Sequence, residues 1–117
     1  DLVLLPTHYQ PSNPLVPIAM RYGVVPIVYG QSGLESMVFD YQKNARKGTG
    51  FQFTPYTSDG LMATTIDAIK VYKDAAKWKS LVRRCLNQDF SWEATAQEYL
   101  KAYRRVTRRV KARVEGE

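Results

Sequence analysis

Two apolar stretches near the start of this chain, separated by a polar loop and a short helix, constrain the fold most. Residues 2–6 and 24–28 are almost continuously apolar, which is typical of buried strands in a parallel sheet. Residues 7–14 contain two prolines and small polar residues, which indicates a loop. Residues 15–22 predict a short helix that ends at Gly23, a residue suited to the left-handed position after a helix. This order predicts an α/β fold, in which ligands bind at the carboxyl ends of the strands.

The rest of the chain predicts a third strand and three further helices. Residues 50–53 alternate as a short strand does, and helices are expected to start near Ser58, Ala75 and Ser91, with Ser58 and Ser91 as N-caps. Pro26 removes one backbone donor, so we expect the second strand to lie near a sheet edge or to be bulged. A complete nucleotide-binding half-domain has about five or six strands. The chain is therefore predicted to be the later part of a Rossmann-like domain, a parallel sheet followed by C-terminal helices.

Apolar residues recur at helical spacing in the second half of the chain, which predicts buried helix faces. Met20 and Tyr22 are expected to contact the core. The other predicted stripes, expected in the core or between domains, are Trp78, Leu81, Val82 and Cys85, and then Trp92, Ala96, Tyr99, Leu100 and Tyr103.

Composition restricts the classes of protein that fit this chain. Its 117 residues are 44% hydrophobic, which indicates one globular domain at most. No apolar run is long enough to cross a bilayer, so we expect a soluble protein. The single cysteine, Cys85, excludes an internal disulfide and gives no zinc pattern, and we expect it to be inert on an apolar helix face. The sequence therefore predicts no metal and no cofactor.

The net charge of +6 is concentrated at the C-terminus, where residues 101–113 hold seven basic residues and no acidic one. Two interpretations stay open: a solvated helical tail, or a surface for an acidic protein partner. Nucleic acid is disfavoured as a partner because no zinc-finger, homeodomain or RNA-recognition signature is present. The candidate partner-binding residues are Arg104, Arg105, Arg108, Arg109, Lys111 and Arg113.

Several short motifs occur in an order that resembles one enzyme family. They are Leu4-Leu-Pro6, Ala19-Met-Arg-Tyr-Gly23 with Val25-Pro-Ile-Val28, Ser32-Gly33-Leu34 with Val38-Phe39-Asp40, Gly48-Thr-Gly-Phe51, and Gln88-Asp-Phe-Ser-Trp92 with Glu98-Tyr-Leu. Over roughly residues 2–105 they resemble the bacterial glycogen synthases and plant starch synthases. The resemblance implies the C-terminal, donor-binding part of a GT-B glycosyltransferase, in which two Rossmann-like domains move glucose from ADP-glucose or UDP-glucose to an α-1,4-glucan without a metal. It also implies a location in a plastid or the cytoplasm.

The resemblance weakens where the family places its catalytic loop. The family's Glu-Pro-Cys-Gly-Leu corresponds to Gln10-Pro-Ser-Asn-Pro14, and its Thr-Gly-Gly corresponds to Gln31-Ser-Gly33. A glutamine carries no charge, and the proline at position 14 has no amide to donate to a diphosphate. No catalytic residue is therefore assigned, although Gln10 stands at the family's glutamate position. The candidate substrate-binding residues are Gln10, Ser12, Asn13, Arg21, Ser32 and Gly33.

Two functional hypotheses follow. The chain is part of a starch or glycogen synthase-like transferase and is inactive alone, or it is a catalytically degenerate domain that now serves as a structural or interaction module. The acceptor domain and the first half of the donor domain are absent from this sequence. We divide the chain into residues 1–57, residues 58–105 with the C-terminal helices, and the basic tail 106–117.

Overall fold

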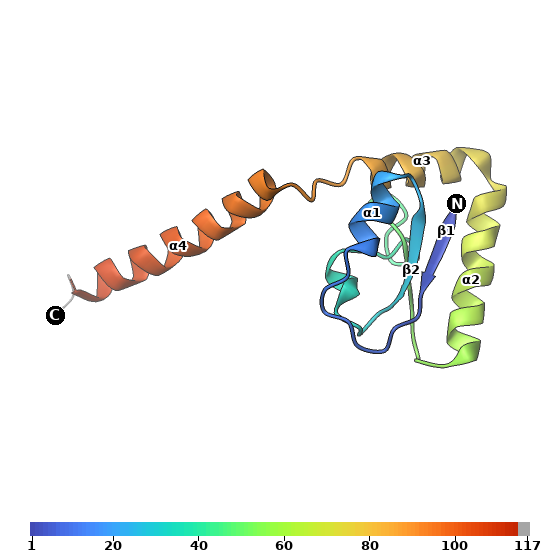
Figure 1. The fold of residues 1–117 in the computed structure, drawn as a ribbon, viewed down its shortest axis with the longest axis horizontal. Coiled ribbons are helices and arrows are strands. Elements are labelled where there is room, and N and C mark those ends of the chain that lie inside the picture. Colours follow the sequence, from blue (N-terminus) through green and yellow to red (C-terminus); the bar gives the residue numbers. More distant parts are fainter. Residues whose placement is uncertain (115–117) are drawn as a thin grey trace.

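The protein is built on a small parallel sheet. The computed structural model describes the backbone of residues 1–114 and the side chains of residues 1–108. Strands β1 (Leu2–Leu5), β2 (Val25–Tyr29) and β3 (Phe51–Phe53) lie in the order β1-β2-β3, and both pairs are parallel (Figure 1). Leu4 lies opposite Ile27, and Ile27 lies opposite Phe51. The predicted α/β class and parallel sheet are therefore confirmed.

The expectation that Pro26 marks an edge or bulge is wrong, because β2 is the central strand and its register is regular. The Val25 amide donates to the Asp1 carbonyl, so the nitrogen of Pro26 faces the opposite side, towards β3. There β3 begins only at Phe51, opposite Ile27, one residue beyond Pro26. The missing donor thus falls outside the paired part of the ladder. Gly50 has no side chain and so leaves room for the Pro26 backbone, since a Cβ at position 50 would lie 2.5 Å from the Pro26 carbonyl oxygen.

Helices follow the strands, and the three longest begin after residues whose side chains cap them. They are α1 (Leu15–Arg21), the 3₁₀ turn η1 (Leu34–Ser36), α2 (Ser58–Lys73), α3 (Ala75–Leu86) and α4 (Trp92–Val114). The predicted Ser91 cap is confirmed, because its Oγ accepts from the Ala94 amide. The predicted Ser58 cap is wrong by one residue: the Thr57 Oγ1 accepts from the Gly60 amide, since Thr57 has the extended backbone that a cap requires.

The core lies between the sheet and its helices. Helices α1 and α3 pack on β2 and on each other, and α2 packs along β3. Gly23 allows the close approach of α1 to α3: its φ is +73°, and a Cβ there would lie 3.2 Å from the Val82 side chain. The predicted faces of α3 and the predicted burial of Met20 are confirmed. The buried apolar residues include Val16, Met20, Ile27, Val28, Leu34, Phe51, Phe53, Ala68, Leu81 and Cys85.

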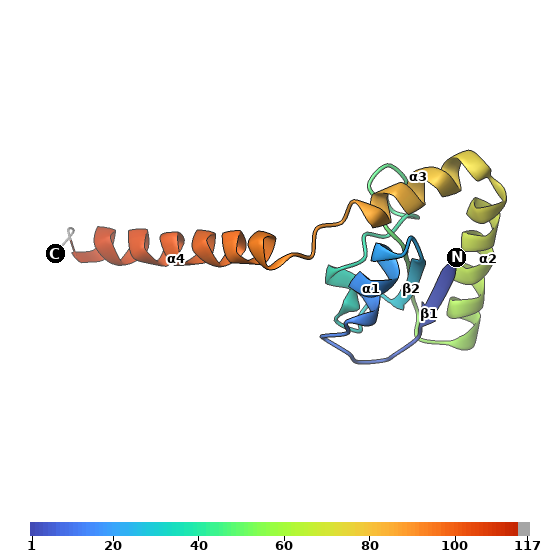
Figure 2. The ribbon, with the colours of Figure 1, turned by 45° about the horizontal axis from the view of Figure 1, so that its top comes forward.

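Helix α4 projects away from this body, which makes the molecule 62 Å long in its largest dimension (Figures 1 and 2). Its apolar stripe is exposed: Trp92 is 83% accessible and Tyr103 is 65% accessible. The part of the prediction that placed this stripe in the core is therefore wrong, while packing between domains stays a prediction. Tyr22 is also exposed, at 82%, because it follows α1 at the surface. No helix within residues 1–114 combines the length and apolar character needed to cross a membrane.

Candidate functional site

Two loops meet at the carboxyl ends of β1 and β2, where α/β sheets bind their ligands. The first loop, residues 6–14, connects β1 to α1, and the second, residues 30–33, connects β2 to η1 (Figure 1). The Gln10 amide donates to the Ser32 carbonyl at 2.7 Å, which joins the loops directly. The structure thus brings together five of the six predicted substrate-binding residues, namely Gln10, Ser12, Asn13, Ser32 and Gly33.

Gly33 makes this close meeting of the loops possible. Its φ of +100° lies in the region that favours glycine, and a Cβ there would stand only 2.5 Å from the Pro11 Cα. The wall of the site therefore consists of backbone from both loops.

Asn13 acts as a structural residue within the first loop. It is only 6% exposed, and its Oδ1 accepts from the Leu15 amide at 2.8 Å. This side chain fixes the turn into α1. Ser12, beside it, is exposed.

The amides of the second loop are already bonded within the protein. The Ser32 amide donates to the Tyr29 carbonyl, and the Leu34 amide donates to Ser32 Oγ. The Gly33 amide donates to a carboxylate oxygen of Glu35 at 2.6 Å. These three donors would otherwise be available to an anionic ligand. The Glu35 carboxylate also brings negative charge to this turn, which disfavours an anionic ligand there.

Gln10 lies where the two loops join and is partly exposed. Its backbone amide donates a hydrogen bond to Ser32, whereas its side chain forms no hydrogen bond with any of the described residues. The amide side chain can therefore donate to or accept from a ligand hydroxyl, but it cannot act as a charged group or a proton acceptor.

Arg21 lies away from the loops, at the other end of α1, which is the C-terminal end beside α3 (Figure 1). Its side chain lines a groove of about 430 Å³ with Tyr22 and the segment that leads into α4, residues 88–91. It therefore does not join the loop site in this chain.

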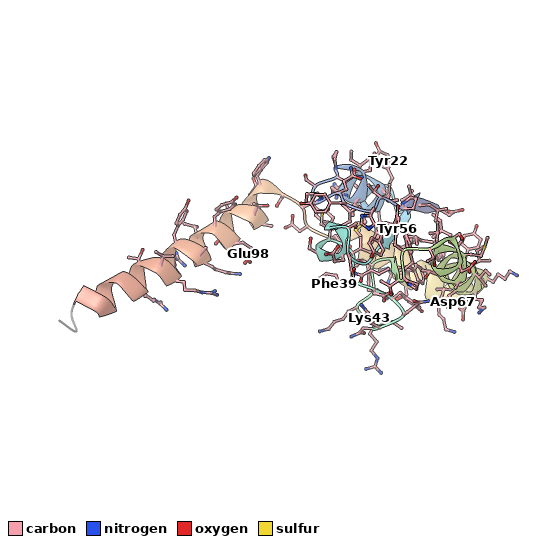
Figure 3. The ribbon with its side chains drawn as sticks, turned by 90° about the horizontal axis from the view of Figure 1, so that it is seen from below. Tyr22, Phe39, Lys43, Tyr56, Asp67 and Glu98 are labelled. Atoms are coloured by element: carbon pink, nitrogen blue, oxygen red, sulfur yellow. The ribbon has the colours of Figure 1, made fainter. Side chains whose placement is uncertain are left out.

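An aromatic cluster borders the loop site and was not predicted as a unit. The His8 ring stacks on Tyr29 with 5.6 Å between centroids and meets the edge of Tyr56 at 4.6 Å. The Tyr56 hydroxyl donates to the Pro6 carbonyl at 2.8 Å. Figure 3, seen from below, shows Tyr56 near the middle of the body. The sequence signal that could have predicted this cluster is the occurrence of aromatic residues at the ends of successive strands.

Chemically reactive groups are few in the described part of the chain. Burial raises the pKa of the Cys85 thiol to about 11, and its Sγ donates to the Thr49 carbonyl at 3.0 Å. A thiol held protonated in this way is a poor nucleophile at neutral pH. Residues 1–114 hold no group of three or more residues suited to bind a metal ion.

The predicted partner-binding residues lie on the projecting helix α4. Arg104, Arg105 and Arg108 are exposed, and with Lys101 they line a shallow groove of about 390 Å³. The side chains of Arg109, Lys111 and Arg113 lie outside the described residues.

Comparison with known proteins identifies the relatives of this fold. No protein-family model matches the chain. A glycogen synthase of Geotalea uraniireducens is 39% identical over 104 residues, which cover 89% of this chain and 22% of that protein. A glycogen synthase of Hydrogenobaculum is 38% identical over 109 residues, 89% of this chain and 23% of that protein.

A solved structure shows that the similarity extends to the three-dimensional fold. The catalytic domain of starch synthase IV from Arabidopsis thaliana, bound to ADP and acarbose, superposes with a TM-score of 0.78 at 34% identity, over 90% of this chain and 22% of that one. The fold is therefore that of a GT-B glycosyltransferase domain. The chain belongs to the glycogen synthase and starch synthase family and corresponds to a C-terminal part of its members, about a fifth of their length.

Proposed function

We propose that this chain is the donor-side part of a starch or glycogen synthase-like glycosyltransferase. The reaction is transfer of glucose from ADP-glucose or UDP-glucose to an α-1,4-glucan, in a plastid or the cytoplasm. The observation that supports the proposal most is that a solved relative with ADP bound matches 90% of the chain, in which two loops meet at the carboxyl ends of β1 and β2. In this chain Gln10, Ser12, Asn13, Ser32 and Gly33 would face the nucleotide sugar.

We propose further that the chain alone does not catalyse the transfer. Gln10 cannot supply the negative charge that a glutamate brings near a sugar that develops positive charge. The Gly33 amide is bonded to Glu35, and the Asn13 side chain is committed to the Leu15 amide. The chain also spans only 22% of the relative's length, so most of a two-domain site would come from elsewhere.

A second function is favoured by one specific observation, the exposure of α4. A helix with an exposed apolar stripe and three exposed arginines is suited to packing against another protein surface. In this alternative the domain has lost catalysis and serves as a structural or interaction module, with an acidic protein facing Arg104, Arg105 and Arg108. Binding to such a partner should weaken as salt rises, because exposed charges are screened over about 8–10 Å at physiological ionic strength.

The two functions are distinguished by restoring the family's acid. Gln10→Glu in the full-length protein should raise the incorporation of labelled glucose from ADP-glucose into a glucan primer if the rest of the site is intact. The matched control is Gln97→Glu, which makes the same chemical change on the exposed helix α4, away from the two loops, and should leave the rate unchanged. An unchanged rate in both variants favours the module. Turnover by the present chain above a no-protein blank would contradict its proposed inactivity.

A further inference from the structure

A basic groove lies between the loop of residues 41–48 and helix α3, apart from the two-loop site. Its volume is about 510 Å³, within the size range of small-molecule sites. Figure 3 shows Lys43, on this loop, on the opposite side of the body from Tyr22. The residues that line the groove are Tyr41, Ala45, Arg46, Ala76, Lys77, Ser80 and Arg84.

Arg84 is held rigidly at the wall of the groove. Its Nε donates to the Gly48 carbonyl at 2.7 Å, and its Nη1 donates to Ser80 Oγ at 2.8 Å. Its guanidinium carbon lies 5.9 Å from the centre of the Tyr41 ring. Gly48 closes the loop tightly, since a Cβ there would stand 2.5 Å from the Tyr41 Cα. A guanidinium fixed in this way loses little side-chain entropy when it binds an anion.

The remaining nitrogen of Arg84 has no acceptor. Within the described residues Nη2 is the one buried side-chain nitrogen or oxygen without a hydrogen-bond partner, and Arg84 forms no salt bridge there. Buried polar groups of this kind are usually satisfied, so an unsatisfied one indicates a missing water or ion.

The charges around the groove are unbalanced. Residues 41–48 and helix α3 hold seven basic residues and no acidic one. Three cations line the groove, namely Arg46, Lys77 and Arg84, and Asp74 is the carboxylate that pairs with one of them, at 3.0 Å from the Lys77 Nζ. The three positive charges and one negative charge leave a surplus of two. This surplus matches a phosphate dianion and exceeds the single charge of a carboxylate.

We propose that the basic groove is a binding site for a small phosphomonoester, with Arg84 as its fixed cation and with Arg46 and Lys77 closing on the phosphate oxygens. The lining of the groove holds three cations and its other members are uncharged, so it fits one phosphate group better than a polyanion. The site is separate from the two loops, and the proposal does not depend on catalysis by the chain.

The test follows the Arg84 side chain directly. Inorganic phosphate is titrated into the ¹⁵N-labelled protein at constant ionic strength, with chloride as the balancing anion, and the Arg84 Nε–H resonance is recorded. Glycerol 3-phosphate is titrated in the same way. We expect a saturable shift with both ligands, and binding of the ester at least as tight as that of inorganic phosphate.

Two variants of the same loop test the geometry. Arg46→Gln should weaken the binding of glycerol 3-phosphate about tenfold, as for the loss of one charge-assisted hydrogen bond. Lys43→Gln removes the same charge from a residue that does not line the groove, and it should change binding less than about twofold. Both side chains are exposed, so circular dichroism should show unchanged folding.

Three results would overturn the proposal. One is a resonance that shifts without saturation, and another is equal weakening by the two variants, which would indicate general surface electrostatics. The third is binding of inorganic phosphate with exclusion of the ester, which would rule out a phosphomonoester as the ligand.

Discussion

The backbone amide of Gly33 donates to the carboxylate of Glu35 at 2.6 Å, at the point where the two ligand-facing loops meet. Gly33 is the residue that this chain retains from the family's glycine-rich turn. Gly33 has a left-handed backbone conformation, with a φ of +100°. Its amide could donate to a ligand, but it already donates to the side chain of Glu35, two residues further along the chain. An anionic ligand at this turn would therefore lack the Gly33 donor and would meet a negative charge.

Removing the Glu35 carboxylate should make the site a better anion binder. Glu35→Gln removes the negative charge beside the Gly33 amide, so we expect the affinity for ADP to rise about fivefold, equivalent to about 1 kcal/mol for a unit charge a few ångströms away. Isothermal titration calorimetry with ADP measures this change. Glu93→Gln removes the same charge from the first turn of α4 and should have no effect. Equal affinity in wild type and Glu35→Gln would show that the contact does not limit binding.

Gly33 should also be required for stability. A methyl group at this position would meet the Pro11 backbone at 2.5 Å and would impose an unfavourable φ, so Gly33→Ala should lower the free energy of unfolding by about 2 kcal/mol or more. The control is Gly30→Ala in the same loop, where the added Cβ would come nearest to the Thr54 methyl, at 3.2 Å, and would make ordinary contacts with Gln52, so the cost should stay within about 1 kcal/mol. Urea denaturation of the two variants measures the difference. Equal losses would contradict the role assigned to the Pro11 contact.

Local patterns in the sequence were sufficient to predict the elements of the body and the class of fold. The continuous apolar strands, Gly23 after α1 and the Ser91 cap each depend on a few neighbouring residues, and the structure confirms them. The position of Pro26 could not be predicted in this way. Whether a strand proline is tolerated depends on which neighbour its nitrogen faces and on where that neighbouring strand begins.

The resemblance implied that the two loops lie together, but it did not show how their groups are bonded. The family pattern placed Gln10 and Gly33 together, but only the folded turn shows that Glu35 reaches back to the Gly33 amide. Arg21 belongs to a matching motif, yet α1 carries it to the far end of the helix. Helical periodicity predicted an apolar face on α4, but periodicity does not specify what covers such a face, and the described residues leave it exposed.

Helix α4 should contribute little to the stability of the body. Its apolar residues are exposed and its packing against the body is slight, so a chain that ends at Phe90 should unfold at the same urea concentration as the whole chain. The α4 segment as a peptide should be weakly helical, because the seven basic residues over positions 101–113 repel one another and no partner covers the apolar stripe. Circular dichroism of the peptide and denaturation of the shortened chain test both statements. A large loss of stability on shortening would show that α4 packs on the body in solution.

Cys85 should make the stability of the protein depend on pH in the alkaline range. Its pKa is raised from 9.0 to about 11 in the folded state, mainly because burial disfavours the thiolate. Below about pH 9 both states hold the proton and the contribution is complete; as pH rises to 11 the unfolded state loses its proton first, so this stabilisation is lost. The two-unit shift corresponds to about 2–3 kcal/mol.

Other groups titrate in the same range, so the measurement compares wild type with Cys85→Ala, in which they are unchanged. The variant should be less stable near pH 8, because the cavity removes packing between α3 and the Thr49 backbone. The stability difference between the two proteins should then shrink as pH rises, and a constant difference from about pH 8 to pH 11 would contradict the burial of the thiol in solution.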